Sequence, residues 1–440
     1  NALGANTTAS NNTAIGKSAL QANTTGVNNV AVGHSAVDAN TTGVNNVGLG
    51  TNALSANTTA EANTAVGTNA LMVNTTGAYN VAVGMSALDA NTTASSNTAI
   101  GYGSLTANTT GASNTALGTN SLDANTTAHN NTAIGYDALT ANTTGTNNTA
   151  LGFSSGLSLT TGATNVAVGT YAAQNLTTGS NNTAVGNATL GATGSTAVTG
   201  ADNTAIGNSA LLAITTGANN VAIGSTALDA NTTGSTNVAV GRLALSANTT
   251  ASDNTAVGDF SLGVNTTGAQ NIAIGGNALS ANTTANDNTA VGYNSLLSNT
   301  TGANNTAVGK SSGSALTTGY RNTFIGSLSG DATDDGFQNT ALGYGALSAN
   351  CGDNNVAIGE SALPVCTGAN NTAVGRVAGL DVTSGQNNLF LGKDAGRAGS
   401  PGGSITTGSN EIILGDENIT EAHIQVDWTV ASDQRDKTDF

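Results

Sequence analysis

The sequence predicts an all-β protein, a parallel β-solenoid built from one short coil that repeats along the chain. Three observations predict this class: a repeating unit that reads roughly NTAVGxxALxANTTGxx, a Gly at a fixed place in each unit, and a composition that excludes the main alternatives. Self-similarity at a fixed period is the signature of repeat architectures, in which each unit contacts only its neighbours.

The repeat Gly sets the period. It recurs every 17 residues from Gly16 to Gly186, and a single step of 21 residues leads to Gly207. The 17-residue spacing then continues to Gly343, and steps of 16, 16, 17 and 23 residues end at Gly415. We count about 24 coils, which at about 4.8 Å each would give a rod of roughly 115 Å. The opening residues match the middle of a unit, so we expect further copies to precede them.

Each unit predicts two short strands and two turns. NTAVG alternates, so Thr and the Val, Ile or Leu should face one way while Ala and Gly face the other. ALxA predicts a second strand with one Leu, and NTTG with the next two residues predicts the return turn, with Asn and Gly where φ is positive. An Asn stands four residues before the Gly in every copy except the last, which has Glu411. We expect this Asn ladder to satisfy turn backbone groups between coils.

The same alternation predicts an assembly. If Val, Ile and Leu fill the coil, the other strand face carries only Ala and Gly and forms a long, flat apolar strip. Soluble monomers avoid such strips, and small residues allow chains to pack closely around an axis. The sequence therefore predicts an obligate homo-oligomer, and we expect a homotrimer.

Composition excludes several other classes. Charged residues make up 8% and aromatic residues 3% of the chain, and there are only two Pro, whereas disordered chains are usually rich in charge and Pro. Thr, Asn and Gly at this density disfavour helices. A net charge of −16 without a basic stripe argues against nucleic acid, and no apolar run is long enough to span a bilayer. A three-sided hexapeptide β-helix would need a six-residue sub-repeat, which is absent.

The NTAIG…AL coils of residues 1 to about 415 resemble the left-handed parallel β-roll heads of trimeric autotransporter adhesins. They resemble the repeat regions of phage tail-fibre proteins still more. The resemblance implies a non-enzymatic, extracellular trimeric fibre, a virion tail fibre that attaches to a host-surface polysaccharide or protein and joins a baseplate or tail protein. It implies no nucleic-acid partner, no membrane insertion and no cofactor. A bacterial trimeric surface adhesin is the alternative, and an ice-binding solenoid with stacked Thr is a third.

The repeat stops after Gly415, and this divides the chain. Residues 1–415 form the predicted repeat fibre. Residues 416–431 carry alternating Ile424, Val426 and Trp428, which predict a capping strand or neck.

Residues 432–440 begin with SDQRDK, which resembles the start of the self-cleaving intramolecular chaperone domain of phage tail fibres and tailspikes. The resemblance implies that Ser432 is the nucleophile, that Lys437 is its base and that cleavage falls between Ser432 and Asp433. Arg435 matches the Arg of the family pattern. A Lys whose pKa is lowered by burial is able to take a Ser proton. The body of that domain does not follow within the sequence, so we expect no cleavage by this chain alone.

Two Cys stand at nearly the same turn of consecutive coils. Stacked coils would bring Cys351 and Cys366 within disulfide range, and we expect a disulfide between them. No His lies close to them in sequence, so they do not suggest a zinc site. His34, His129 and His423 are interpreted as surface residues, and no metal site is expected. The recurrent NTT is interpreted as turn chemistry, although it fits the N-glycosylation sequon.

The residue after the repeat Gly varies most along the chain, which predicts that it faces solvent. Aromatic rings at this position could contact sugars or a host surface, or could only cover neighbouring coils. The candidates are Tyr102, Tyr136, Phe153, Tyr293 and Tyr344.

Overall fold

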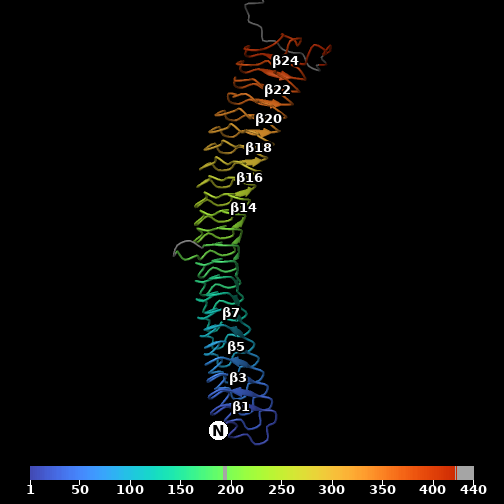
Figure 1. The fold of residues 1–440 in the computed structure, drawn as a ribbon. Coiled ribbons are helices and arrows are strands. Elements are labelled where there is room, and N and C mark those ends of the chain that lie inside the picture. The colour runs from blue at the N-terminus through green and yellow to red at the C-terminus, as the bar shows by residue number, and fades with distance from the viewer. Residues whose placement is uncertain (192–195, 422, 424–440) are drawn as a thin grey trace, which may run out of the picture.

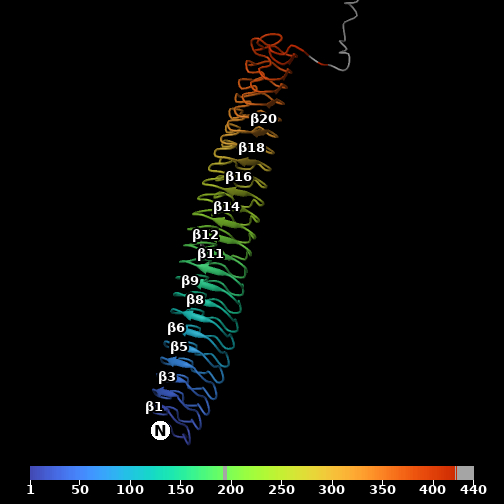
Figure 2. The ribbon, with the colours of Figure 1, turned by 90° about the vertical axis from the view of Figure 1, so that its right-hand side faces the viewer.

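The computed structural model describes residues 1–191, 196–421 and 423 as a gently curved rod of stacked coils (Figures 1 and 2). This described part is all-β and contains no helix. One strand of three residues occurs in each coil. In chain order the strands are β1 Thr13–Ile15, β2 Val30–Val32, β3 Val47–Leu49, β4 Thr64–Val66, β5 Val81–Val83, β6 Thr98–Ile100, β7 Thr115–Leu117, β8 Thr132–Ile134, β9 Thr149–Leu151, β10 Val166–Val168, β11 Thr183–Val185, β12 Thr204–Ile206, β13 Val221–Ile223, β14 Val238–Val240, β15 Thr255–Val257, β16 Ile272–Ile274, β17 Thr289–Val291, β18 Thr306–Val308, β19 Thr323–Ile325, β20 Thr340–Leu342, β21 Val356–Ile358, β22 Thr372–Val374, β23 Leu389–Leu391 and β24 Ile412–Leu414.

The strands form one parallel sheet that runs the length of the rod. Each strand pairs in register with the one before it and the one after it, so that Ala14 lies opposite Ala31 and, in the last pair, Phe390 lies opposite Ile413. The predicted period is confirmed, including the 21-residue step between β11 and β12. That step does not interrupt the pairing of β11 with β12, and the chain after it joins the stack at a bridge between Leu176 and Val198.

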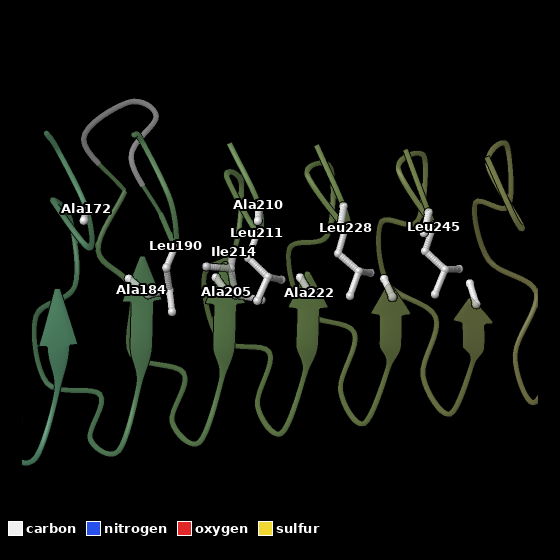
Figure 3. Close-up of a cluster of buried hydrophobic side chains, with 14 of the residues drawn as sticks. Ala172, Ala184, Leu190, Ala205, Ala210, Leu211, Ile214, Ala222, Leu228 and Leu245 are labelled. Atoms are coloured by element: carbon white, nitrogen blue, oxygen red, sulfur yellow. The ribbon is translucent and has the colours of Figure 1, made fainter. Parts of the chain in front are cut away.

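The predicted alternation of side chains along the strand has the correct period, but the prediction of which residues face the interior is wrong. The central Ala of a strand faces the interior, and the first and third residues face outward: Ala205 is fully buried, whereas Ile206 is 38% exposed. In Figure 3, Ala205 and Ala222 lie beneath the Leu211 and Leu228 side chains of the opposite segment. Because the coil is thin and each Leu fills most of the space between its sides, only a methyl group fits opposite. The predicted outer strip of Ala and Gly is therefore internal.

The predicted second strand does not form. The residues after the repeat Gly make a turn in which every second residue is left-handed, as at Ser18 (φ 61°) and Leu20 (φ 51°). This conformation costs about 1 kcal/mol for a residue with a Cβ. The segment still bonds to the next coil, because Leu20 N–H donates to Ala36 O at 3.0 Å and Ala22 N–H donates to Asp38 O at 2.9 Å. Hydrogen bonds between coils and burial of the Leu side chain therefore stabilise the left-handed backbone conformation.

The repeat Gly is required for two reasons. Gly101, after β6, has φ of 137°, a region that residues with a side chain rarely adopt. A Cβ at this position would also lie 2.4 Å from the carbonyl oxygen of Gly118 in the next coil. In the return turn, positive φ falls on the residue before the ladder Asn, such as Asn28 at 62°, and not on the Gly of NTTG as the sequence suggested.

The predicted Asn ladder is confirmed and lies inside the coil. We call the series from Asn12 and Asn29 to Asn388 the inner Asn ladder. Asn29 N–H donates to Asn12 Oδ1 in the preceding coil at 2.9 Å, and Asn29 Nδ2 donates to Gly43 O in the following turn at 2.9 Å. Through its backbone N–H and its side chain together, each ladder Asn thus joins its own coil to the preceding and the following coil. Buried amides satisfied in this way stabilise one stacking register.

A second buried series, the turn Asn ladder, comes from the Asn of NTT. Asn40 Nδ2 donates to Asn23 Oδ1 at 2.8 Å and closes its own turn by donating to Gly43 O at 3.0 Å. The Asn is replaced in two blocks of coils, by apolar residues with the exception of Thr333, and the first block begins at Leu159. Since each Nδ2 donates to the preceding coil, the last Asn before a block has an Oδ1 without a donor. In the described residues, Asn142 and Asn299 have such buried, unpartnered oxygens.

Asn57→Leu is expected to destabilise the rod more than Asn142→Leu. The first change creates a new ladder end, because Asn57 Nδ2 no longer donates to Asn40 Oδ1. The second only moves an existing end by one coil, to Asn125. A newly unpaired buried acceptor costs about 1–3 kcal/mol. Thermal unfolding of the two variants beside the wild type measures the difference, and equal losses would contradict the ladder account.

Two large side chains in the interior, Phe324 and Phe390, are accompanied by Gly at neighbouring positions that Leu usually occupies. Phe324 replaces the central strand Ala in β19, and Gly313 and Gly330 replace the Leu in the turn segments beside it. A Cβ on Gly313 would lie 2.9 Å from the Phe324 ring, and one on Gly330 would lie 2.7 Å from it. Likewise, a Cβ on Gly379 would lie 3.3 Å from the ring of Phe390 in β23, and one on Gly396 would lie 2.5 Å from it. Interior volume is thus conserved across neighbouring coils, as close packing requires.

Phe324→Ala is expected to cost about 3–5 kcal/mol, because neither glycine can fill the cavity. Adding Gly313→Leu and Gly330→Leu restores the ordinary Ala and Leu arrangement and is expected to recover most of that loss. Gly313 already has φ of 60°, close to the value that Leu adopts in other coils. Denaturation midpoints of the single and triple variants test this, and a triple variant no more stable than Phe324→Ala refutes the volume argument.

Candidate interaction surfaces

The outward side of the parallel sheet is an uncharged surface in which the third residues of the strands, all Val, Ile or Leu, form a continuous apolar row. We call the first and third residues of β1 to β24 the strand face. Every one of them is Thr, Val, Ile or Leu, so no charged side chain interrupts the strand face from end to end. Exposed members include Ile223 at 37%, Ile274 at 41% and Ile412 at 63%.

The strand face is both flat and large. Register is the same in every described strand pair, so equivalent residues stack directly along the rod. With a strand spacing of about 4.8 Å, the face has an area on the order of 1,000 Å². Exposed apolar patches on ordinary monomers rarely exceed a few hundred Å². An uncharged face of this size is typical of a surface that another chain covers.

The variable residue after the repeat Gly does face solvent, as expected. We call this series the post-glycine row. The five candidates are 45–58% exposed: Tyr102, Tyr136, Phe153, Tyr293 and Tyr344. The structure brings only two of them together, since the Tyr136 and Phe153 rings stack with centroids 5.4 Å apart. Tyr293 lies over Gly276 of the preceding coil, and Tyr344 lies three coils farther on.

Sequence reasoning missed two aromatic contacts. Tyr171 contacts Phe153 edge to face at 5.4 Å, although it stands one residue later in its coil than the row predicts. Tyr320 and Phe337 stack at 5.0 Å on the opposite corner, before the strand, and Arg321 lies 5.7 Å from the Tyr320 ring centroid. A search for aromatic residues 17 or 18 apart, rather than at one repeat position, would have found both.

The C-terminal half of the post-glycine row also carries ion pairs. Arg242 pairs with Asp259 of the next coil at 2.9 Å, and Arg376 pairs with Glu360 at 3.2 Å. These side chains are more than half exposed, so each pair contributes little to stability. The row therefore carries both aromatic residues and ion pairs in the C-terminal half of the rod.

Cys351 and Cys366 lie inside the coil, within the second apolar block of the turn series. Both are free thiols in the structure, and the disulfide between them stays a prediction. Cys351 Sγ lies 3.1 Å from Thr333 Oγ1, and Asn371 Nδ2 donates to Cys366 Sγ at 3.4 Å. Burial raises the pKa of Cys351 to about 11 and also raises that of Cys366, so both thiols are weak nucleophiles at neutral pH.

Several Asp side chains follow the inward-facing position of the turn segment, which is usually Leu, and are partly buried. Burial raises the pKa of four of them above the ordinary value of 3.8: Asp38, Asp89, Asp229 and Asp331. Backbone hydrogen bonds lower the pKa of Asp229 only in part. A carboxyl whose pKa is raised by folding binds protons better when folded, so its destabilising effect is present at neutral pH and disappears as the pH falls below the unfolded value.

Asp229→Ser is expected to raise the unfolding temperature at neutral pH and to have little effect below about pH 3.5, where the carboxyl is protonated in both states. Ser246 occupies the same position in the next coil, so Ser fits there. The reciprocal Ser246→Asp is expected to lower the unfolding temperature at neutral pH only. Thermal unfolding at both pH values tests the pair, and an Asp229→Ser effect that is independent of pH would show that burial of charge is not the cause.

The remaining candidate sites can be placed briefly. A cavity of about 370 Å³ lies against the last coils, between Asn370 and Ile412, and one of about 260 Å³ lies beside Asp394 and Arg397. Within the described ranges, no group of three or more His, Cys, Asp or Glu could hold a metal ion. No helix in that same part has the length and apolar character needed to cross a bilayer.

The three His are exposed, and His129 Nδ1 accepts a hydrogen bond from Ala112 N–H. The expected capping strand at 424–428 and the residues Ser432, Asp433, Arg435 and Lys437 lie outside the described residues.

Comparison with known proteins yields no family for this chain. No protein-family model matches it, and no curated protein matches it. Any functional assignment therefore depends on the geometry of the rod and its surfaces.

Proposed function

We propose that the protein is the shaft of a homotrimeric attachment fibre, a tail fibre or surface adhesin that holds a receptor-binding part away from its base. The observation that carries this proposal is the strand face, which is uncharged and runs the length of the rod. Three copies with their strand faces toward a common axis would remove these faces from water. This interface differs from the Ala and Gly strip that the sequence suggested. The reason for expecting an assembly is the same, because an exposed apolar strip along the rod is more stable when another chain covers it.

The area of the strand face suits a permanent assembly. A face on the order of 1,000 Å² per chain is comparable to the roughly 800 Å² that each partner contributes to a stable interface. Parallel copies in register would place the Val, Ile or Leu at the third position of each strand against the same residue types along the whole rod. The function of such a fibre is mechanical: a stiff rod gives reach, and three receptor-binding parts give avidity.

Ile223→Lys with Ile274→Lys is expected to abolish the trimer, because two charges per chain would be buried at the axis. The matched control is Thr233→Lys with Thr267→Lys, which places lysines on exposed turns of nearby coils and is expected to leave the trimer intact. Native mass spectrometry reports the stoichiometry, and circular dichroism checks that the coils remain folded. A monomeric wild type overturns the proposal, and trimeric Ile→Lys variants overturn the interface.

We also propose that the fibre matures by release of a C-terminal chaperone domain, which is supported by the SDQRDK segment at 432–437. The same mass spectra, recorded on protein expressed from the full-length gene, give the position of the C-terminus. Chains that end at Ser432 support cleavage before Asp433, and chains that extend past Asp433 contradict it. The phage and bacterial alternatives share the shaft, and the interface experiment applies to both.

A further inference from the structure

Three aromatic rings form one exposed surface over consecutive coils. We call Tyr136, Phe153 and Tyr171 the aromatic patch. Tyr136 and Phe153 stack nearly parallel, with 9° between the ring planes, and Tyr171 meets Phe153 edge to face. All three remain 38–49% exposed. Each ring therefore contacts its neighbours and still presents much of its surface to solvent.

The fold does not need rings at these positions. In other coils Thr51 and Thr68 occupy the positions of Tyr136 and Phe153, and Asn52 and Asn69 occupy the position of Tyr171 with nearly the same φ. Scattered exposed apolar residues are normal on a protein surface, but a contiguous exposed aromatic surface indicates an interaction site. The patch thus adds nothing that the solenoid requires.

Polar side chains run directly beside the patch. Asn120 and Asp137 follow Thr119 and Tyr136 and are partly exposed, and Asn120 Nδ2 donates to Asp137 Oδ1 at 3.1 Å. Ser154, which follows Phe153, is buried. Planar amide and carboxylate groups next to aromatic rings provide donors and acceptors for hydroxyl groups, while the rings accept apolar C–H faces. This combination matches the two sides of a pyranose sugar.

The charge around the patch limits the ligand further. Residues 18–241 contain no Lys or Arg and seven Asp or Glu. A polymer that carries phosphate, sulfate or carboxylate groups would find no cation there and would be repelled by the acidic chain. The neutral character of the patch therefore favours an uncharged partner.

We propose that the aromatic patch binds a neutral glycan, a linear polysaccharide whose sugar rings lie on Tyr136, Phe153 and Tyr171. The ring centroids are 5.4 Å apart from one coil to the next, so successive units of a linear polymer would each meet an aromatic ring, with Tyr171 turned relative to the other two. A flat, repeated and uncharged ligand fits this surface better than a folded protein, which would need a larger and less regular contact. This inference deepens the proposed attachment function and depends on it.

Affinity electrophoresis of the full chain tests the proposal. Gels contain one neutral polysaccharide each (a mixed-linkage β-glucan, a galactomannan, a mannan or amylose), and alginate serves as the acidic comparison. At least one neutral polymer is expected to retard the wild type, and alginate is not. Tyr136→Thr, Phe153→Thr and Tyr171→Thr combined are expected to weaken that retardation roughly tenfold or more, because buried aromatic anchors dominate such contacts.

Tyr293→Thr with Tyr344→Thr is the matched control, since it removes two exposed but isolated rings and is expected to leave retardation unchanged. No retardation by any neutral polymer, equal retardation of the triple variant, or preference for alginate overturns the glycan site. Binding of the labelled fibre to host cells is measured in parallel. Cell binding that survives in the triple variant overturns the glycan site alone, whereas a monomeric wild type in native mass spectra overturns the proposed fibre itself.

Discussion

In-register stacking of coils through backbone hydrogen bonds is the constraint on which the rest of the structure depends. Every coil lies directly over the last, so each residue has the equivalent residue of the next coil as its neighbour. The Gly at the strand end follows from this closeness, because Gly84 has no room for a Cβ beside the Gly101 carbonyl. The Asn ladders follow as well, since an amide that donates to one coil and accepts from the other needs the same residue at the same place each time.

The period of the sequence was sufficient to predict the solenoid, and the irregular steps near Gly207 and Gly359 were read correctly. Which face of the strand points to the interior was not predictable from alternation alone, because both faces carry small or apolar residues and the pattern does not distinguish them. The volume inside the coil determines which face points inward. Leu228 fills most of that volume and leaves space only for the methyl group of Ala222, so Ile223 faces outward. The left-handed backbone conformation of the turn-segment Leu was equally unpredictable from sequence. The intrinsic backbone preference of Leu disfavours it, and only contacts with the neighbouring coils stabilise it.

The candidate surfaces were predicted unevenly for the same reason. Exposure of the post-glycine row could be predicted from its variability, and the five aromatic candidates are exposed. Contact between Tyr136, Phe153 and Tyr171 depends on ring orientation across three coils, which no single repeat position encodes. The strand face was predicted as an apolar strip but with the wrong residues, because the inference began from the wrong side of the strand.

Interior and surface obey different rules in this rod, and that difference explains how one repeat can carry function. Inside, a change in one coil requires a matching change in the next, as Phe324 requires Gly313 and Gly330. On the post-glycine row, Thr119 is followed by Tyr136 one coil later with no adjustment of the backbone. The row is therefore free to vary in chemistry, from stacked rings to the Arg242–Asp259 pair, while the shaft keeps its shape. A stiff scaffold with one unconstrained row of side chains can acquire a binding site in any coil without any change in its strand face.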